Sequence, residues 1–162
     1  MMRLSPLGLS ILKHYEGKGG KPVLKAYRCP GGEWTIGFGT ILYPNNAPVR
    51  QGDRCTPEQA EAYLQHDVRI AETTVRALFH DDNLAQHQFD ALVCFRHNCG
   101  VGAISNSSLQ AYIQKGGRDR QRISDLFCAW HFADGRRLDG LLARRSTEAF
   151  LFNTGQVRFF EL

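Results

Sequence analysis

The chain has 162 residues and no hydrophobic run that approaches the roughly 20 residues needed for a membrane-spanning helix. Residues 1–13 lack the apolar stretch and the small-residue cleavage site of a secretory leader. We therefore expect that the protein is synthesised in the cytoplasm and that it does not insert stably into a membrane. Internal repeats and low-complexity tracts are also missing, so we expect a single domain with its own hydrophobic core.

Metal-binding motifs are missing as well. The five cysteines show no Cys-x-x-Cys spacing, and the six histidines form no His-Glu-x-x-His motif. We expect no metal and no other cofactor. An odd number of cysteines is typical of a reduced chain rather than of a disulfide framework. A Cys29–Cys55 disulfide formed after export stays open as an alternative.

The positive charge is modest and unevenly distributed. The net charge of +4, without a helix-turn-helix, zinc-finger or aromatic-basic RNA motif, argues against a nucleic-acid partner. Residues 1–54 carry eight Lys or Arg against three acids, and residues 111–145 carry eight against four. A surface of this kind attracts polyanions such as cell-wall polymers, although single charges on solvated helix faces need no partner.

Glu16 lies at the end of the first predicted helix. Ser5 followed by Pro6 is a typical helix start, and glycines from Gly17 onward end the helix. The carboxyl group of Glu16 then lies at the negative end of the helix dipole, where it retains a proton more readily. This position suits a general acid.

A short strand is predicted next to this helix end. Residues 34–38 alternate in a way that places Glu33 and Thr35 on one face and Trp34 on the other. A helix end that faces a small sheet makes a cleft. These residues are therefore candidates for a catalytic site.

The remainder of the sequence is helical. Thr56-Pro57-Glu58-Gln59 is a capping-box start. The apolar stripe of the helix that follows comprises Ala60, Leu64, Val68, Ala71, Val75 and Leu78. We expect helices over residues 56–80, 84–98, 108–115, 122–133 and 138–152, with Gly100 and Gly102 ending the second.

These elements predict an α+β fold that is mostly α. We expect residues 17–55 to form a small β-hairpin lobe and residues 56–80 to form a long connecting helix. Residues 81–162, together with 1–16, then form an all-helical lobe, with a cleft between the two lobes.

Several segments resemble the phage-type lysozyme family of glycoside hydrolases, also called endolysins or muramidases. The segments that carry the resemblance are Tyr15-Glu16-Gly17, residues 24–27, 34–40, 88–92, 98–102, 107–109, 127–130 and 140–145, and Glu148. Their order and spacing match the family over nearly the whole chain. The resemblance implies a two-lobed lysozyme-like fold. It also implies hydrolysis of the β-1,4 bond between N-acetylmuramic acid and N-acetylglucosamine in peptidoglycan.

The same resemblance assigns site residues. Glu16 matches the catalytic acid and Thr35 the active-site threonine, whereas the aspartate that the family usually has six positions earlier is Cys29 here. Three hypotheses follow for the second group: a Cys29 thiolate, a carboxylate from Glu33, or no second charge. The substrate-binding residues implied by the family are Gly39, Ile41, His97 and Ser108.

The family also implies partners and a location. We expect peptidoglycan as the substrate, a monomer, and synthesis in the host cytoplasm followed by holin-dependent release to the cell wall or periplasm. Two alternatives remain open: a lytic transglycosylase acting on the same bond, and a catalytically impaired peptidoglycan-binding protein. Arg144 and Arg145 are expected to pair with acids in a structural role.

Overall fold

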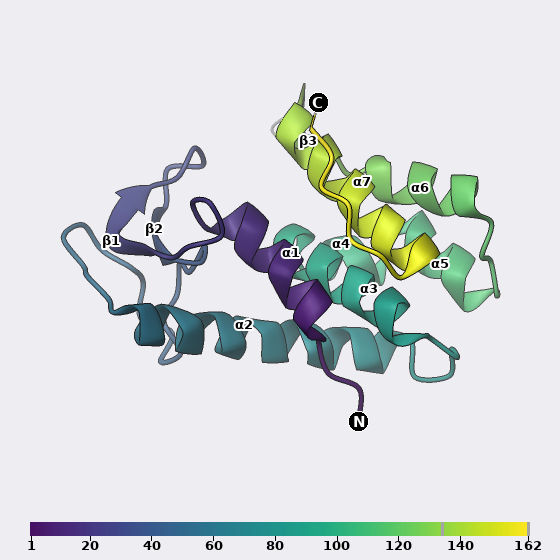
Figure 1. Ribbon diagram of the computed structural model, residues 1–162, viewed down its shortest axis with the longest axis horizontal. Coiled ribbons are helices and arrows are strands. Elements are labelled where there is room, and N and C mark those ends of the chain that lie inside the picture. Colours follow the sequence, from purple (N-terminus) through teal and green to yellow (C-terminus); the bar gives the residue numbers. More distant parts are fainter. Residues whose placement is uncertain (134, 162) are drawn as a thin grey trace. The chain divides into compact units, whose positions relative to one another are not determined.

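The computed structural model describes residues 1–133 and 135–161, and it is mostly helical (Figure 1). The chain divides into two compact units. Met1–Ile11 and Ala71–Leu162 form the first, which we call the helical unit, and Leu12–Ile70 form the second, the hairpin unit. Both divisions fall inside helices, namely α1 (Pro6–Glu16) and α2 (Pro57–Leu78).

The starts of these two helices agree with the predictions. The hydroxyl of Ser5 accepts the backbone N–H of Gly8 at 3.5 Å, directly before α1. At α2, the Gln59 N–H donates to Thr56 Oγ1 at 3.1 Å, and the Thr56 N–H donates to Gln59 Oε1 at 2.9 Å. The predicted capping box is therefore present.

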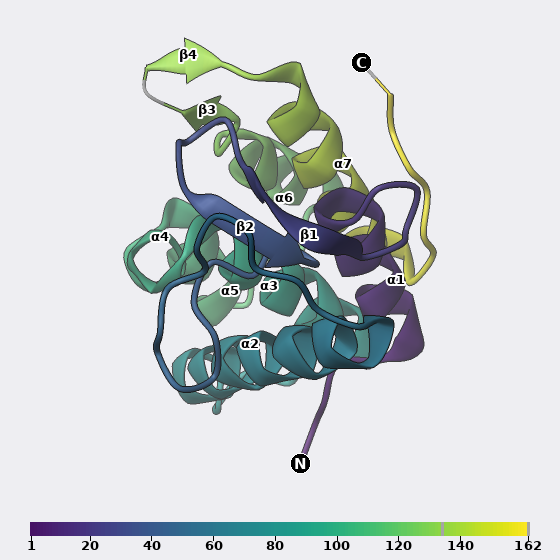
Figure 2. The same ribbon diagram turned by 90° about the vertical axis from the view of Figure 1, so that its left-hand side faces the viewer.

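The hairpin unit contains one antiparallel strand pair. Strands β1 (Val23–Arg28) and β2 (Trp34–Gly37) pair so that Tyr27 lies opposite Thr35 and Arg28 opposite Trp34 (Figure 2). The loop before β1 turns at Gly19 and Gly20, whose φ angles of 58° and 76° suit glycine. The first strand is thereby led back from the end of α1.

The helical unit is built on helices α3 (Gln86–Cys99), α4 (Val101–Ser105), α5 (Ser108–Gln114), α6 (Arg120–Cys128) and α7 (Asp139–Thr154). Aromatic rings join three of these helices in the core. Phe95 of α3 packs edge-to-face on Phe127 of α6 at 5.7 Å between ring centroids, and Phe127 lies 5.9 Å from Phe152 of α7. In Figure 1 the C-terminal tail runs back along α7, where Phe160 contacts Phe150.

The structure corrects two boundaries. The helix predicted over 122–133 ends at Cys128, and strand β3 (Phe132–Ala133) then pairs with β4 (Arg136–Arg137). The physical reason lies in Gly135, whose φ of 73° between the two strands is one that glycine adopts readily in tight hairpin turns. Gly102 was expected to end a helix but lies inside α4, and Gly100 alone, at a φ of 89°, separates α3 from α4.

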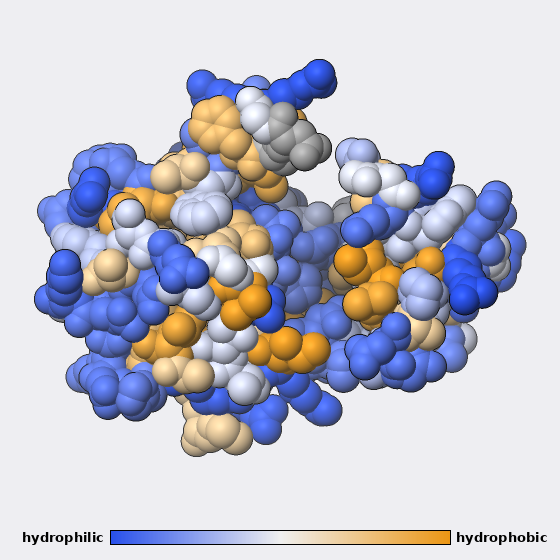
Figure 3. All heavy atoms as spheres, turned by 180° about the vertical axis from the view of Figure 1, so that it is seen from behind, coloured by the Kyte–Doolittle hydropathy of each residue, from blue (hydrophilic) through white to orange (hydrophobic). Residues whose placement is uncertain are grey.

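The apolar stripe of α2 is core, as predicted. Ala60, Leu64, Val68, Ala71 and Val75 are at most 3% exposed, and Leu78 is half-buried. On the face shown in Figure 3, hydrophobic side chains reach the surface in separate groups among hydrophilic ones. None of the described helices is both long enough and apolar enough to cross a membrane.

Candidate active site

Glu16 is the last residue of α1, and its half-buried side chain lies within the hairpin unit. The helix end is held by Lys13, whose ammonium group lies 2.7 Å from Glu61 Oε2 and 5.5 Å from the centroid of the Phe38 ring. These contacts tie the last turn of α1 to α2 and to the residue that follows β2. The position of Glu16 at a helix terminus, predicted from the glycines, is confirmed.

Gly39 lies directly against the carboxyl group of Glu16. A Cβ atom at position 39 would overlap Glu16 Oε2, and the φ of 79° is one that residues with side chains rarely adopt. The backbone of the segment that follows β2 can therefore approach the carboxyl group closely only because residue 39 is glycine. This close approach restricts where the Glu16 side chain can point.

The register of the strand pair aligns Tyr27, Cys29 and Thr35 in the hairpin unit. Tyr27 lies opposite Thr35. One residue beyond β1, the Cys29 backbone N–H donates to the Glu33 carbonyl at 2.9 Å. Burial raises the pKa of Tyr27, and the negative charges of Glu16 and Cys29 raise it further. The Tyr27 ring is thus near both of the ionisable groups that the sequence singled out.

The Cys29 thiol lies in surroundings that favour its ionised form. Burial and the charge of Glu33 would raise its pKa, but polar interactions with the Thr35 side chain and with the backbone at Glu33 and Gly31 outweigh these effects, and the pKa falls below its ordinary value. Interactions of this kind favour the thiolate. At a given pH, the ionised fraction of Cys29 is therefore larger than that of an unperturbed thiol.

Thr35 and Glu33 are placed differently from each other. Thr35 is only 4% exposed, and its hydroxyl donates to the Glu33 carbonyl at 3.2 Å. Glu33 precedes β2, and its carboxylate is exposed. The backbone of Glu33 thus orders Cys29 and Thr35, whereas its side chain is turned to solvent.

The predicted substrate-binding residues fall in both units. Gly39 and Ile41 are in the hairpin unit, with Ile41 40% exposed. His97, half-buried in the last turn of α3, and Ser108, exposed at the start of α5, are in the helical unit. Their binding of substrate stays a prediction.

Tyr27 and Thr40 were not among the predicted site residues. Tyr27 belongs to the Leu-Lys-Ala-Tyr segment, which is one of the segments that resemble the family. Thr40 is 1% exposed, and its hydroxyl has no hydrogen-bond partner within residues 1–133 and 135–161. The sequence alone could not identify either residue, because the position of Tyr27 depends on pairing across strands and that of Thr40 on burial.

All five cysteines carry free thiols, so Cys29 and Cys55 are not joined by a disulfide in this structure. Burial raises the pKa of the other four thiols, Cys55, Cys94, Cys99 and Cys128. Cys29 is therefore the thiol whose surroundings favour ionisation.

Arg144 and Arg145 have the structural role that was expected. Glu148 Oε1 lies 2.8 Å from Arg145 Nη2 and 3.4 Å from Arg144 Nε, all on α7. The Arg145 guanidinium also donates to Asn98 Oδ1 at 2.9 Å and to the sulfur of Cys99, and it lies over the Phe95 ring. The cluster thus joins α7 to the end of α3.

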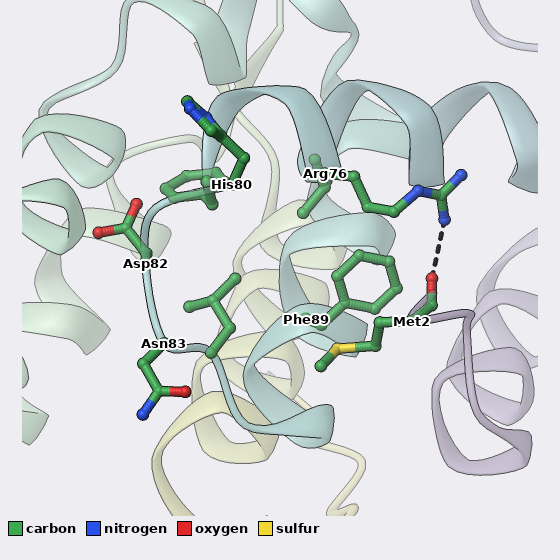
Figure 4. A pocket seen from close by; sticks show the side chains of 9 residues that line it. Met2, Arg76, His80, Asp82, Asn83 and Phe89 are labelled. Carbon is green, nitrogen blue, oxygen red and sulfur yellow. Dashed lines mark hydrogen bonds between the residues drawn. The ribbon is translucent and has the colours of Figure 1, made fainter.

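A pocket of about 380 Å³ lies in the helical unit, far along the chain from these groups. Figure 4 shows the Met2 and Phe89 side chains in it, together with the bond from Arg76 to the Met2 carbonyl at 2.8 Å. Glu16, Cys29 and Thr35 do not line it. We therefore identify the candidate active site from its side-chain chemistry and not from cavity size.

Comparisons with known proteins show the family of this chain. The phage lysozyme family model matches residues 13–148. The endolysin of Acyrthosiphon pisum secondary endosymbiont phage 1 is 38% identical over 160 residues, which cover 94% of this chain and 99% of that protein. The endolysin of Bacillus phage PZA is 36% identical, with 95% of this chain matching 56% of that protein.

A solved structure supports the same assignment. The endolysin from Escherichia coli O157:H7 phage FAHEc1 superposes with a TM-score of 0.85 at 31% identity, over 97% of each chain. Sequence and fold therefore agree over the same residues, and the chain belongs to the phage lysozyme family.

Proposed function

We propose that this protein hydrolyses the β-1,4 bond between N-acetylmuramic acid and N-acetylglucosamine in peptidoglycan, with Glu16 as its general acid. A peptidoglycan-hydrolysing endolysin for host lysis is the function that the family and its endolysin relatives support. The observation that carries the catalytic assignment is the Glu16 carboxyl group at the end of α1, held against the backbone of Gly39.

The reaction breaks the bond between the anomeric carbon and the bridging oxygen. Glu16 gives its proton to that oxygen, so that the sugar leaves as an alcohol. Water adds its hydroxyl group to the anomeric carbon, and its remaining proton returns to a base. The transition state resembles an oxocarbenium ion, which a nearby negative charge stabilises.

We assign the second role to Cys29 together with Thr35. The surroundings of the thiol, Thr35 and the backbone at Glu33 and Gly31, lower its pKa, so a thiolate can supply the negative charge. We further propose that the buried Thr35 hydroxyl orients the attacking water. The exposed carboxylate of Glu33 lacks these contacts, which makes it the weaker candidate.

The remaining expectations concern setting and assembly. We propose that the protein acts as a monomer on the cell wall, after synthesis in the host cytoplasm and holin-dependent release. We further propose that His97 and Ser108 contact the glycan. These statements rest on the family resemblance.

The deciding experiment replaces the acid. Glu16→Gln keeps the size of the side chain but cannot donate a proton to the leaving oxygen, so lysis of permeabilised cells should fall at least ~100-fold. Glu33→Gln is the matched control, because it removes an exposed carboxylate of the same unit. A Glu16→Gln protein that lyses cells at the wild-type rate would refute the assignment, and a larger loss from Glu33→Gln would move the role to Glu33.

A further inference from the structure

The hairpin unit carries a second feature that the catalytic assignment leaves unexplained. A depression of about 350 Å³ is lined by Tyr43, Pro44, Asn45 and Tyr63. The Tyr43 and Tyr63 rings meet edge-to-face, with centroids 5.2 Å apart and planes at 64°. Both side chains are half-buried, so parts of two aromatic rings face the same hollow.

The hollow is held in shape by its own hydrogen bonds. The Tyr43 hydroxyl donates to Asp53 Oδ2 at 2.7 Å, and the same oxygen accepts the Arg50 N–H at 2.9 Å. The Tyr43 N–H donates to the Ala47 carbonyl, also at 2.9 Å. The Tyr43 ring is therefore fixed before any ligand arrives, which reduces the entropic cost of binding.

Polar groups are available beside the rings. Asn45 Oδ1 accepts the Ala47 N–H at 3.0 Å, which orients the exposed Asn45 amide and leaves its NH₂ group to donate to a ligand. Aromatic rings combined with an amide suit a pyranose ring that carries an N-acetyl group. The C–H face of the sugar packs on the ring, and the amide bonds its oxygens.

Two short chain connections limit the distance between the hollow and the catalytic groups within the same unit. Gly39 lies against Glu16 and precedes Tyr43 by four residues, which span at most ~14 Å of extended chain. Gly37, at the end of β2, packs on Ala60, which precedes Tyr63 by less than one turn of α2. The loop between β2 and α2 that carries Tyr43 faces the viewer in Figure 2.

We propose that Tyr43, Asn45 and Tyr63 form an accessory subsite for the N-acetylated sugars of a glycan strand, beyond the bond cleaved at Glu16. The inference rests on the proposed function, because it extends the same substrate along the hairpin unit. It assigns a binding role to residues that the resemblance did not mark. The expected ligand is carbohydrate, held by ring stacking and amide hydrogen bonds.

The test measures binding without turnover. The full chain carrying Glu16→Gln, labelled with ¹⁵N, is titrated with tetra-N-acetylchitotetraose, and amide shifts are followed by NMR. The amide signals of Tyr43, Asn45, Asn46, Ala47 and Tyr63 should shift. A second substitution, Tyr63→Ser, should raise the dissociation constant roughly 10-fold, because one stacking ring is lost. Ile70→Ser, which truncates an exposed side chain on the same helix, should leave the constant unchanged.

The outcomes separate the two proposals. Shifts confined to the surroundings of Cys29 and Thr35, or an unchanged constant in Tyr63→Ser, would overturn the subsite while Glu16→Gln stays inactive. Lytic activity in Glu16→Gln would instead overturn the catalytic assignment, whatever the titration shows. If Tyr63→Ser does not fold, Asn45→Ala decides, since its exposed side chain is outside the core, and undiminished binding there would reject the subsite.

Discussion

Two glutamates of this chain lie in opposite kinds of surroundings. Glu148 is fully buried on α7, and its carboxylate is shared by two guanidinium groups. Glu16 is half-buried at the end of α1, with the Gly39 backbone directly against its carboxyl group. The Glu148 carboxylate is thus enclosed with two guanidinium groups, whereas the Glu16 side chain is partly exposed to solvent.

This difference separates a structural acid from the one that we propose to be catalytic. Burial raises the pKa of Glu148, and the charges of Arg145 and Arg144 act in the opposite direction. Such a cluster contributes to the fold because each charge would be costly without the others. An acid that donates a proton to a sugar must instead reach solvent-exposed substrate.

The first test of the difference between Glu148 and Glu16 removes the buried carboxylate of Glu148. Glu148→Gln should lower the free energy of unfolding by about 3–5 kcal/mol, since it leaves two guanidinium groups buried without an anion. Chemical denaturation at neutral pH measures the loss. Glu16→Gln is the matched variant, and its stability should stay within about 0.5 kcal/mol of wild type. Equal losses in both variants would remove the distinction.

The second way tests the partner of Glu16. Cys29→Ala should reduce the lysis rate roughly 100-fold, because the negative charge near the developing oxocarbenium ion is lost. Cys29→Asp should retain or raise activity, since it restores a permanent anion of similar reach. Turbidity of permeabilised cells measures both. A fully active Cys29→Ala, Glu33→Gln double variant would show that neither group is required.

The third test has the smallest expected effect and compares the reactivity of the five cysteine thiols. Because the pKa of Cys29 is lowered and those of the other four cysteines are raised, iodoacetamide at pH 7.5 should alkylate Cys29 first. As the pH falls through the pKa of Cys29, the thiolate is protonated and the rate should fall. Peptide mass spectrometry identifies the site, and activity should decline in step. Faster labelling of Cys99 or Cys128 would contradict this ranking.

The expected surface charge remains a prediction. Residues 1–54 and 111–145 are rich in Lys and Arg, yet many of these side chains are individually exposed. Lys13 shows that a cation from such a segment can serve the fold, because it pairs with Glu61 at the end of α1. Composition alone therefore does not separate charges that attract a polymer from charges that hold an element.

Much of the fold was accessible from local sequence. The capping box at Thr56 and the stripe from Ala60 to Val75 act within one helix, so α2 was predicted nearly to its ends. The hairpin β3–β4 was missed because an apolar helical pattern before residue 133 outweighed the turn signal of Asp134-Gly135. Here a short-range turn preference determined the structure.

The sequence by itself determined the helical elements, the helix end at Glu16 and the family, because capping, periodicity and motif order are properties of neighbouring residues. Only the tertiary structure decided that Tyr27 lies opposite Thr35, that Gly39 lies against the Glu16 carboxyl group, and that the Cys29 N–H donates to the Glu33 carbonyl. It also brought Tyr43 and Tyr63 together. These contacts depend on strand register and on packing between distant segments, and the ionisation of a thiol depends on the hydrogen bonds that such packing provides.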